Sequence, residues 1–187
     1  MLSLSGHKIY APKGVGALYI KKGIEFERFL DGGHQEKNKR AGTENVSEIV
    51  GLGKACEIAE KYLDDYHNKL KCLRDYCLEN IKNKIPDIYV NGTMKSRLPG
   101  NINICIKDVN SSELLFKLDG VGICASGGSA CSSGQSKPSH VLTAIGVPNN
   151  LAEGVLRLTF GDFNTKEDVD YLVYHLERIV KELRNNL

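Results

Sequence analysis

Hydrophobic residues recur at intervals of three and four positions between Val46 and Ile85, which is the period of one helix face. The stripe consists of Ile49, Leu52, Cys56, Ala59, Leu63, Tyr66, Leu70, Leu73, Cys77 and Ile81. Pro86 follows and cannot continue a helix. The pattern therefore predicts one long helix over residues 46–85, in which Gly51 and Gly53 mark a bend or close packing near the start.

Beyond Pro86 the period changes from helical spacing to strict alternation, which predicts short strands. Residues 88–90 and 101–107 are separated by an Asn91-Gly92 turn, and a third strand covers 156–160. In the second strand three isoleucines at 102, 104 and 106 share one face, so Cys105 should lie on the other. In the third strand Arg157 and Thr159 share a face. A further short strand is expected at 121–124.

Three helices are predicted between and after these strands. The first opens at Ser111 and ends at Gly120, and a short one covers 138–146. The last covers 169–183 and follows Thr165-Lys-Glu-Asp168, a capping-box pattern. The resulting β-α-β-α-β-α order predicts an α+β sandwich of helices on a small sheet.

The first 45 residues have weaker patterns. Residues 1–22 are predicted to be a polar loop followed by a strand at 14–20, because Pro12-Lys13-Gly14 is a turn signal and the next residues are β-rich. Residues 23–45 show no clear period and predict a long ordered loop, a kind that is usually functional. Thr43 or Asn45 is expected to cap the helix that follows, and a phosphate could bind there as well.

Composition and charge exclude several classes of function. The 187 residues are 41% hydrophobic, and their formal net charge of +2 favours neither nucleic acid nor an anionic membrane as partner. No apolar run is long enough to span a bilayer and the start lacks the pattern of a secretory signal, so a cytoplasmic location is expected.

Six cysteines are present, and they are expected to be reduced thiols. Cys56, Cys72 and Cys77 lie in helical sequence, where we expect core-facing or stem residues without chemistry. No Cys-x-x-Cys occurs, so no metal site is predicted.

One cysteine has a different setting. Cys131 lies in a stretch of glycine, serine and alanine over residues 122–134, a composition that favours a mobile surface loop. Reactive cysteines are partly exposed, whereas buried ones are usually inert. We therefore expect Cys131 to be a reactive thiol.

Two other positions admit both an ordinary and a functional interpretation. Lys8, in Ser5-Gly-His-Lys8, is either a turn lysine or a lysine presented at a strand end with Ser5 and His7 as donors to an anion. Arg157 is either a solvated outer-face residue or a planar fork that binds a carboxylate in bidentate fashion. These patterns alone do not decide between the two.

Three motifs, in order, resemble those of the NifS-type cysteine desulfurases, pyridoxal-phosphate enzymes of the class V aminotransferase group. Residues 5–19 resemble the family's cofactor-lysine segment, Arg40-Ala-Gly-Thr-Glu-Asn45 its phosphate motif, and Gly128-Ser-Ala-Cys-Ser-Ser133 its nucleophile loop. A fourth segment, residues 155–161, matches the part that carries the substrate-carboxylate arginine.

The resemblance implies a role for each candidate residue. Lys8 would form the Schiff base with pyridoxal 5'-phosphate, while Ser5 and His7 would hold its phosphate. Thr43 would reach the phosphate in the other subunit of a homodimer, and Arg157 would bind the carboxylate of L-cysteine. Cys131 would take the substrate's sulfur as a persulfide, releasing alanine, and pass it to a sulfur-acceptor or scaffold protein for iron–sulfur cluster or other thio-cofactor assembly.

The resemblance also implies the fold class: α/β, the C-terminal part of a fold-type I pyridoxal-phosphate transferase. Residues 1–50 would be a remnant of the large domain, 51–85 a connecting helix, and 86–187 a small α+β domain. The family has roughly as much sequence again before the lysine, so we expect a truncated chain, inactive by itself. Ala11, His34 and Asn38 stand where the family has glycine, and Ser136-Lys137 replaces its usual Leu-Glu. Strain is expected at Ala11 and His34, and less at Asn38.

Three functions remain open at this point. The chain is a desulfurase half that works with a partner half-chain, a non-catalytic domain that binds a sulfur acceptor or that partner half, or a related enzyme such as a selenocysteine lyase. Cys131 argues against a plain aminotransferase. We also expect the strand at 14–20 to present an exposed edge prone to self-association.

Overall fold

The computed structural model describes residues 1–128 and 139–185, which divide into two compact units, Met1–Leu63 and Asp64–Leu187. The fold is mixed α/β, as expected. Among the described residues, no helix is both long and apolar enough to cross a membrane. Cys131 and the Ser136-Lys137 pair lie outside the described residues.

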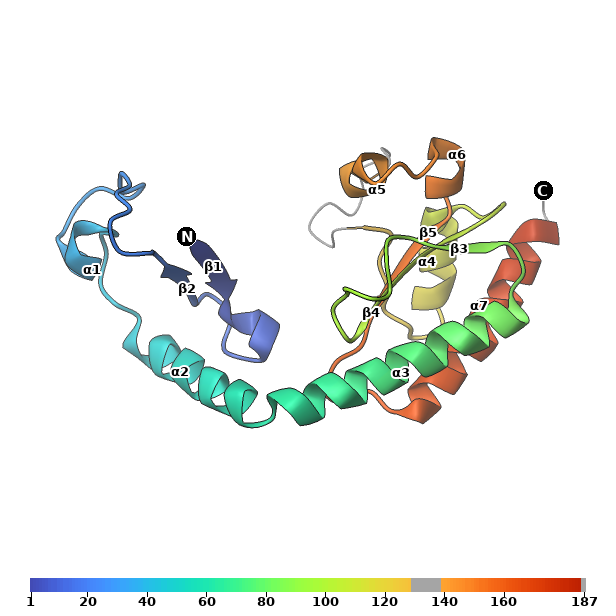
Figure 1. Cartoon of the computed structure of the whole chain (residues 1–187), viewed down its shortest axis with the longest axis horizontal. Helices are drawn as coiled ribbons and strands as arrows, with labels where there is room; N and C mark the ends of the chain where they lie inside the picture. The colour runs from blue at the N-terminus through green and yellow to red at the C-terminus, as the bar shows by residue number, and fades with distance from the viewer. Residues whose placement is uncertain (129–138, 186–187) are drawn as a thin grey trace. The chain divides into compact units, whose positions relative to one another are not determined.

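The first unit contains a hairpin, a short turn helix and a longer helix (Figure 1). Its elements are β1 (Leu2–Ser5), η1 (Gly6–Ile9), β2 (Gly16–Tyr19), α1 (Gln35–Asn38) and α2 (Val46–Lys61). The prediction of a polar loop before β2 is wrong at β1, which pairs antiparallel with β2 from Leu2↔Tyr19 to Ser5↔Gly16. Pairing with a β-rich partner overrides the weak local preference of Leu-Ser-Leu-Ser.

The predicted long helix is two helices, because α2 ends at Lys61 and α3 (Leu63–Lys84) begins two residues later. Tyr62 between them has φ −110° and ψ 15°, outside the helical range. Each helix buries apolar residues in the core of its own unit, Leu52 and Ala55 in the first and Leu70 to Ile81 in the second. The stripe continues through Tyr62 without glycine or proline, so the period could not reveal the break.

The second unit is built on a three-stranded antiparallel sheet in the order β3-β4-β5, with helices on both faces (Figure 1). Its remaining elements are β3 (Ile88–Val90), β4 (Asn101–Ile106), α4 (Ser111–Asp119), α5 (His140–Ala144), α6 (Asn149–Ala152), β5 (Val155–Thr159) and α7 (Lys166–Asn185). The predicted strands β3, β4 and β5 and the predicted helices α4, α5 and α7 occur in the expected sequence, but the strand expected between α4 and α5 is not formed and α6 was not expected.

The two faces of this sheet have different partners. One face carries the isoleucines of β4 and Leu156 and Leu158 of β5, which form the main core with α3, α4 and α7. Cys105 lies on the opposite face, as predicted, and is fully buried with Val155 under α5 and α6. The expected face of Cys77 is confirmed too, but Cys56 and Cys72 are exposed on their helices.

The predicted strand at 121–124 is wrong. Gly120 ends α4 as expected, but the next residues fold back on the helix, where Val121 and Ile123 donate their backbone N–H groups to the Leu118 carbonyl. The chain reaches the sheet only at Ser126, which forms an isolated antiparallel bridge with Arg157.

Candidate functional site

Ser5, His7 and Lys8 are brought together in one turn of the first unit. Ser5 ends β1, and His7 and Lys8 lie in η1, the 3-10 helix that follows. All three are exposed. The turn closes at Tyr10, which has φ 63° and donates its backbone N–H to the Gly6 carbonyl.

Gly6 is required for this turn, because its position leaves no room for a side chain. A Cβ atom there would lie 2.9 Å from the Val15 carbonyl oxygen and 3.1 Å from the Ala11 Cβ. Gly6 also donates its N–H to that carbonyl at 2.9 Å. The glycine thus holds Ser5 and His7 on either side of a point of close backbone approach.

Helix α2 packs against the residues that follow this turn. Ala11 packs with Leu52 and Ala55 of α2, and a Cβ at Gly51 would lie 2.9 Å from two ring carbons of Pro12. The close packing expected at Gly51 is therefore confirmed, whereas a Cβ at Gly53 would meet no atom of the described residues within 4 Å.

Thr43 lies in the loop before α2 and is exposed. Gly42 before it has φ 105° and donates its N–H to Oε1 of Gln35 at 3.2 Å. Asn45 is at the N-cap position, but its side chain accepts from the Ser47 hydroxyl at 3.1 Å instead of capping the backbone. Of the two residues expected to cap α2, Asn45 therefore occupies the cap position, but its side chain does not bond to the helix backbone.

The three departures from glycine behave differently. Asn38 has φ 63°, the left-handed conformation that asparagine tolerates. Ala11 and His34 have no positive φ, so the strain expected at these two positions is absent. The left-handed residues next to Asn38 are instead Glu36 and Lys37.

Arg157 lies on β5 in the second unit and is half-buried. It alternates with buried Leu156 and Leu158, so its side chain is on the sheet face opposite the main core. Its backbone exchanges hydrogen bonds with Ser126, at 2.6 Å from the Arg157 N–H and at 3.2 Å back. No ion pair joins its guanidinium to a carboxylate in the part of the chain that the structure describes.

Both ends of the segment that carries Cys131 are held to this unit. Before it, a Cβ at Gly127 would lie 2.5 Å from the Ser111 hydroxyl, which itself donates to the Val155 carbonyl at 2.7 Å. After it, Ser139 starts α5, whose Leu142 is buried beside Cys105. The first of these ends is therefore fixed against β5, the strand that bears Arg157.

A polar network beside Arg157 was not foreseen. Buried Asn91 donates its side-chain N–H groups to Asn103 Oδ1 at 2.7 Å and to Cys105 Sγ at 3.1 Å. Burial raises the pKa of Cys105, and the Asn91 hydrogen bond partly opposes that shift. The alternation of β4 places Asn103 and Cys105 on one face, but only the strand register shows that this face includes Arg157.

The comparisons with known proteins cover nearly the whole chain. The family model described as aminotransferase class V matches residues 1–172. The chain is 50% identical over 184 residues to a cysteine desulfurase IscS of Dictyoglomus turgidum, covering 98% of the chain and 47% of that protein. It is 48% identical over 185 residues to a cysteine desulfurase IscS of Methanosarcina thermophila, covering 99% and 46%.

Solved structures agree with this match. A NifS-like protein aligns with a TM-score of 0.85 at 32% identity, covering 96% of the chain and 46% of that structure. A NifS-like protein of Rickettsia africae aligns with a TM-score of 0.86 at 29% identity, covering 96% and 47%. The chain thus spans about half the length of the curated relatives it matches, and it belongs to the class V aminotransferases, among the cysteine desulfurases of the IscS/NifS-like type.

Proposed function

We propose that this chain forms part of a pyridoxal-phosphate-dependent cysteine desulfurase, which converts L-cysteine to L-alanine and passes the sulfur on from a persulfide of Cys131. The acceptor is a scaffold or carrier protein of iron–sulfur cluster or other thio-cofactor assembly. The remaining part of the active site comes from a partner half-chain or from the second subunit of a homodimer. In this proposal residues 1–50 belong to the cofactor domain of a fold-type I transferase and residues 86–187 form its small domain. Residues 51–85 connect the two domains.

The turn that carries Ser5, His7 and Lys8, called the Lys8 turn from here on, has side chains that fit the cofactor. A hydroxyl, an imidazole and an amine are exposed on one turn, and none of the three side chains has a hydrogen bond to another residue among those the structure describes. The first two are suitable donors to a phosphate and the third is a nucleophile toward an aldehyde. In the proposal Ser5 and His7 would hold the phosphate of pyridoxal phosphate, and Thr43 would reach that phosphate from the other subunit of a dimer. The Lys8 amine would be the group that reacts with the cofactor's aldehyde.

When bound, pyridoxal phosphate supplies an electron sink for the carbanion that forms at the substrate α-carbon. Lys8 is the base that takes the α-proton and later returns a proton to the product. Arg157 orients the substrate by binding its carboxylate through two parallel N–H groups.

Cys131 is the sulfur acceptor. Its thiolate attacks the substrate sulfur, so that an S–S bond forms as the substrate C–S bond breaks and the carbon fragment is released as alanine after protonation. The persulfide remains on Cys131 until an acceptor thiol attacks its outer sulfur. Because the nucleophile must visit both the substrate and the acceptor, it needs a loop that is fixed at its ends.

The pairing of Ser126 with Arg157 supports this proposal most directly. It attaches the segment leading to the nucleophile to the strand that bears the carboxylate-binding arginine. A substrate held by Arg157 would therefore lie within reach of a thiol that enters from the same strand edge.

The test supplies the missing half. The chain is mixed with pyridoxal phosphate and the N-terminal half of the Dictyoglomus turgidum desulfurase, and unbound cofactor is removed. The absorbance of the cofactor that stays attached to the protein, near the visible edge, and alanine formation from L-cysteine are then followed. We expect Lys8→Ala to abolish both signals, and Cys131→Ser to abolish alanine formation while keeping the absorbance.

Two exposed residues provide matched controls, Lys13→Ala for the lysine and Cys124→Ser for the cysteine. Both controls should retain both signals. Cofactor absorbance or alanine formation that survives Lys8→Ala would contradict the proposal. Comparing alanine release from cysteine and from selenocysteine then separates a desulfurase from a selenocysteine lyase.

A further inference from the structure

Asn103 is held in one orientation by a buried network. Its Oδ1 accepts from the Asn91 side chain at 2.7 Å, and its backbone carbonyl accepts from the Asn91 N–H at 2.9 Å. Asn91 is 6% exposed, and its amide is fixed in turn by Cys105, which is fully buried. The acceptor end of the Asn103 amide is therefore used inside the protein, whereas its NH2 end is directed away from Asn91.

The strand register places Asn103 directly opposite Arg157. Ile106 donates its backbone N–H to Gly154 and Phe160 donates to Gly100, so the hydrogen-bonded pairs of this ladder are the even-numbered residues of β4. Asn103 and Arg157 consequently form a non-hydrogen-bonded pair, the type in which opposed side chains approach most closely, about 4.5 Å between Cα atoms. Both side chains are on the face opposite the main core.

Neither side chain donates a hydrogen bond to another residue in the part of the chain that the structure describes. No hydrogen bond from Asn103 Nδ2 or from the Arg157 guanidinium is found among residues 1–128 and 139–185. The neighbouring asparagine of the same face, Asn101, also accepts a hydrogen bond at its Oδ1, from Arg97 at 3.3 Å, but it lies opposite Thr159 instead of Arg157. Asn103 is thus the amide that presents N–H groups beside Arg157.

A carboxylate matches this arrangement, since it offers only acceptors and carries the charge that complements a guanidinium. We propose that Asn103 is a second binding residue for the substrate carboxylate, donating from Nδ2 to one carboxylate oxygen while Arg157 holds the group by its guanidinium. Asn91 and Cys105 are positioning residues that orient the Asn103 amide. This inference rests on the proposed function of Arg157 and adds to it a residue that selects for the α-carboxylate.

The experiment uses the 187-residue chain itself. The side-chain NH2 signal of Asn103 and the Nε–H signal of Arg157 are followed by NMR while L-alanine, the expected product, is added. Both signals should shift with one dissociation constant. L-alaninamide, which lacks the carboxylate charge, should leave both signals in place.

Variants then assign the effect to Asn103. Loss of one hydrogen bond to a charged group in Asn103→Ala should weaken L-alanine binding roughly tenfold, followed on the Arg157 signal. Asn103→Asp keeps the shape but puts a carboxylate beside Arg157, so it should weaken binding more. Thr159→Val is the matched control, because Thr159 pairs with Asn101 in the next cross-strand pair on the same face. This variant should bind L-alanine like the unmodified chain.

The possible failures are distinguishable. Should Asn103→Ala and Asn103→Asp bind L-alanine as tightly as the unmodified chain while Arg157→Ala does not bind, Asn103 has no part in recognition and the role of Arg157 stands. If neither signal responds to L-alanine, the carboxylate site is wrong as a whole, including the role of Arg157. A shift that L-alaninamide produces equally would also overturn the assignment to the carboxylate.

Discussion

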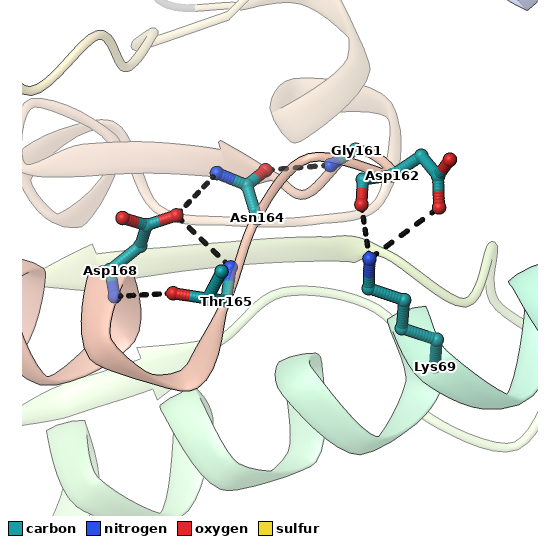
Figure 2. Close-up of polar contacts among 6 residues, drawn as sticks. All are labelled: Lys69, Gly161, Asp162, Asn164, Thr165 and Asp168. Carbon is teal, nitrogen blue, oxygen red and sulfur yellow. Dashed lines mark hydrogen bonds and ion pairs between the residues drawn. The ribbon is translucent and has the colours of Figure 1, made fainter.

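At the start of α7, the side chains of Thr165 and Asp168 each accept a hydrogen bond from the other residue's backbone N–H. The Asp168 N–H donates to the Thr165 hydroxyl at 3.3 Å, and the Thr165 N–H donates to the Asp168 carboxylate at 3.0 Å (Figure 2). Asn164 extends the cap by donating to Asp168 and accepting from the Gly161 N–H. The predicted capping box is confirmed, and it fixes how the chain leaves β5 and enters the last helix.

Removing this cap should destabilise the second unit. We expect Thr165→Ala and Asp168→Ala each to lower the free energy of unfolding by about 1 kcal/mol, because each leaves a helix-end N–H without its partner. The double variant should cost less than the sum, since both residues belong to one reciprocal pair. Urea denaturation of the four proteins checks this, and Glu167→Ala, outside the box, is the control. Additive losses would show that the two bonds act independently.

The cap was predictable because all of its information is local. Thr165, Asp168 and the apolar period that follows are contiguous in the sequence, so a pattern of four residues suffices. The same is true of the alternation that put Cys105 opposite the isoleucines. The break at Tyr62 was not predictable, since the two helices serve separate cores and the residues between them contain no breaker.

The candidate site shows the same division. Lys8, Thr43 and Arg157 were predicted from motifs and stay predictions, whereas the strand that carries Arg157 was predicted from its alternation and is present. The Ser126 bridge and the Asn91 network join residues that are 31 and 12 positions apart in the chain, and strand register depends on the whole sheet. Sequence alternation gives the face of each side chain on its own strand but does not tell which residue lies across from it.

Tyr76 and Asp170 should make the stability of the second unit sensitive to alkaline pH. The Tyr76 hydroxyl donates to the Asp170 carboxylate at 2.6 Å. This hydrogen bond, followed by burial and the Asp170 charge, raises the pKa of Tyr76 above its usual value of 10.0. A group with a raised pKa stabilises the fold below the unfolded-state pKa, and the contribution is lost as the pH rises through the folded-state value.

Tyr76→Phe should therefore be less stable than the unmodified chain at pH 7, and the difference should shrink above about pH 10. Phenylalanine keeps the ring over which the Lys166 ammonium lies at 4.6 Å, so the variant removes the hydroxyl alone. Guanidinium denaturation over a pH series measures the difference. A stability difference that does not shrink at alkaline pH would contradict a contribution from the protonated hydroxyl and its bond to Asp170.

The described cysteines should differ strongly in reactivity. Burial raises the pKa of Cys77 to about 12 and also raises the pKa of Cys105, and both side chains are fully buried. Cys56, Cys72 and Cys124 are exposed. In a Cys131→Ser background, iodoacetamide at pH 7.5 should modify the three exposed thiols first, because alkylation requires an accessible thiolate.

Peptide mass spectrometry over time gives the rate at each cysteine, and addition of urea should make the two buried thiols react like the others. Early modification of Cys105 without urea would show that the face of the sheet under α5 opens readily. Such opening would also disturb Asn91 and Asn103, so this rate reports on the network next to Arg157.

Two glycines of α2 offer a matched test of how the Lys8 turn is supported. Gly51 and Gly53 are two residues apart in the same helix, so an alanine at either gains up to about 1 kcal/mol of helix propensity. At Gly53 the added methyl group meets nothing within 4 Å, and Gly53→Ala should stabilise the first unit. At Gly51 it would lie 2.9 Å from the Pro12 ring, so Gly51→Ala should cost about 1–3 kcal/mol of packing strain.

Hydrogen exchange can detect the difference at the turn itself. The Ala11 N–H is bonded to the Gly6 carbonyl at 3.1 Å, and Ala11 packs on α2. Gly51→Ala should speed the exchange of that amide, whereas Gly53→Ala should leave it unchanged or slow it. Equal exchange rates in the two variants would mean that α2 does not hold the turn. The lysine would then depend for its position on the β1–β2 hairpin and the Gly6 contact alone, and Gly6→Ala would become the decisive substitution.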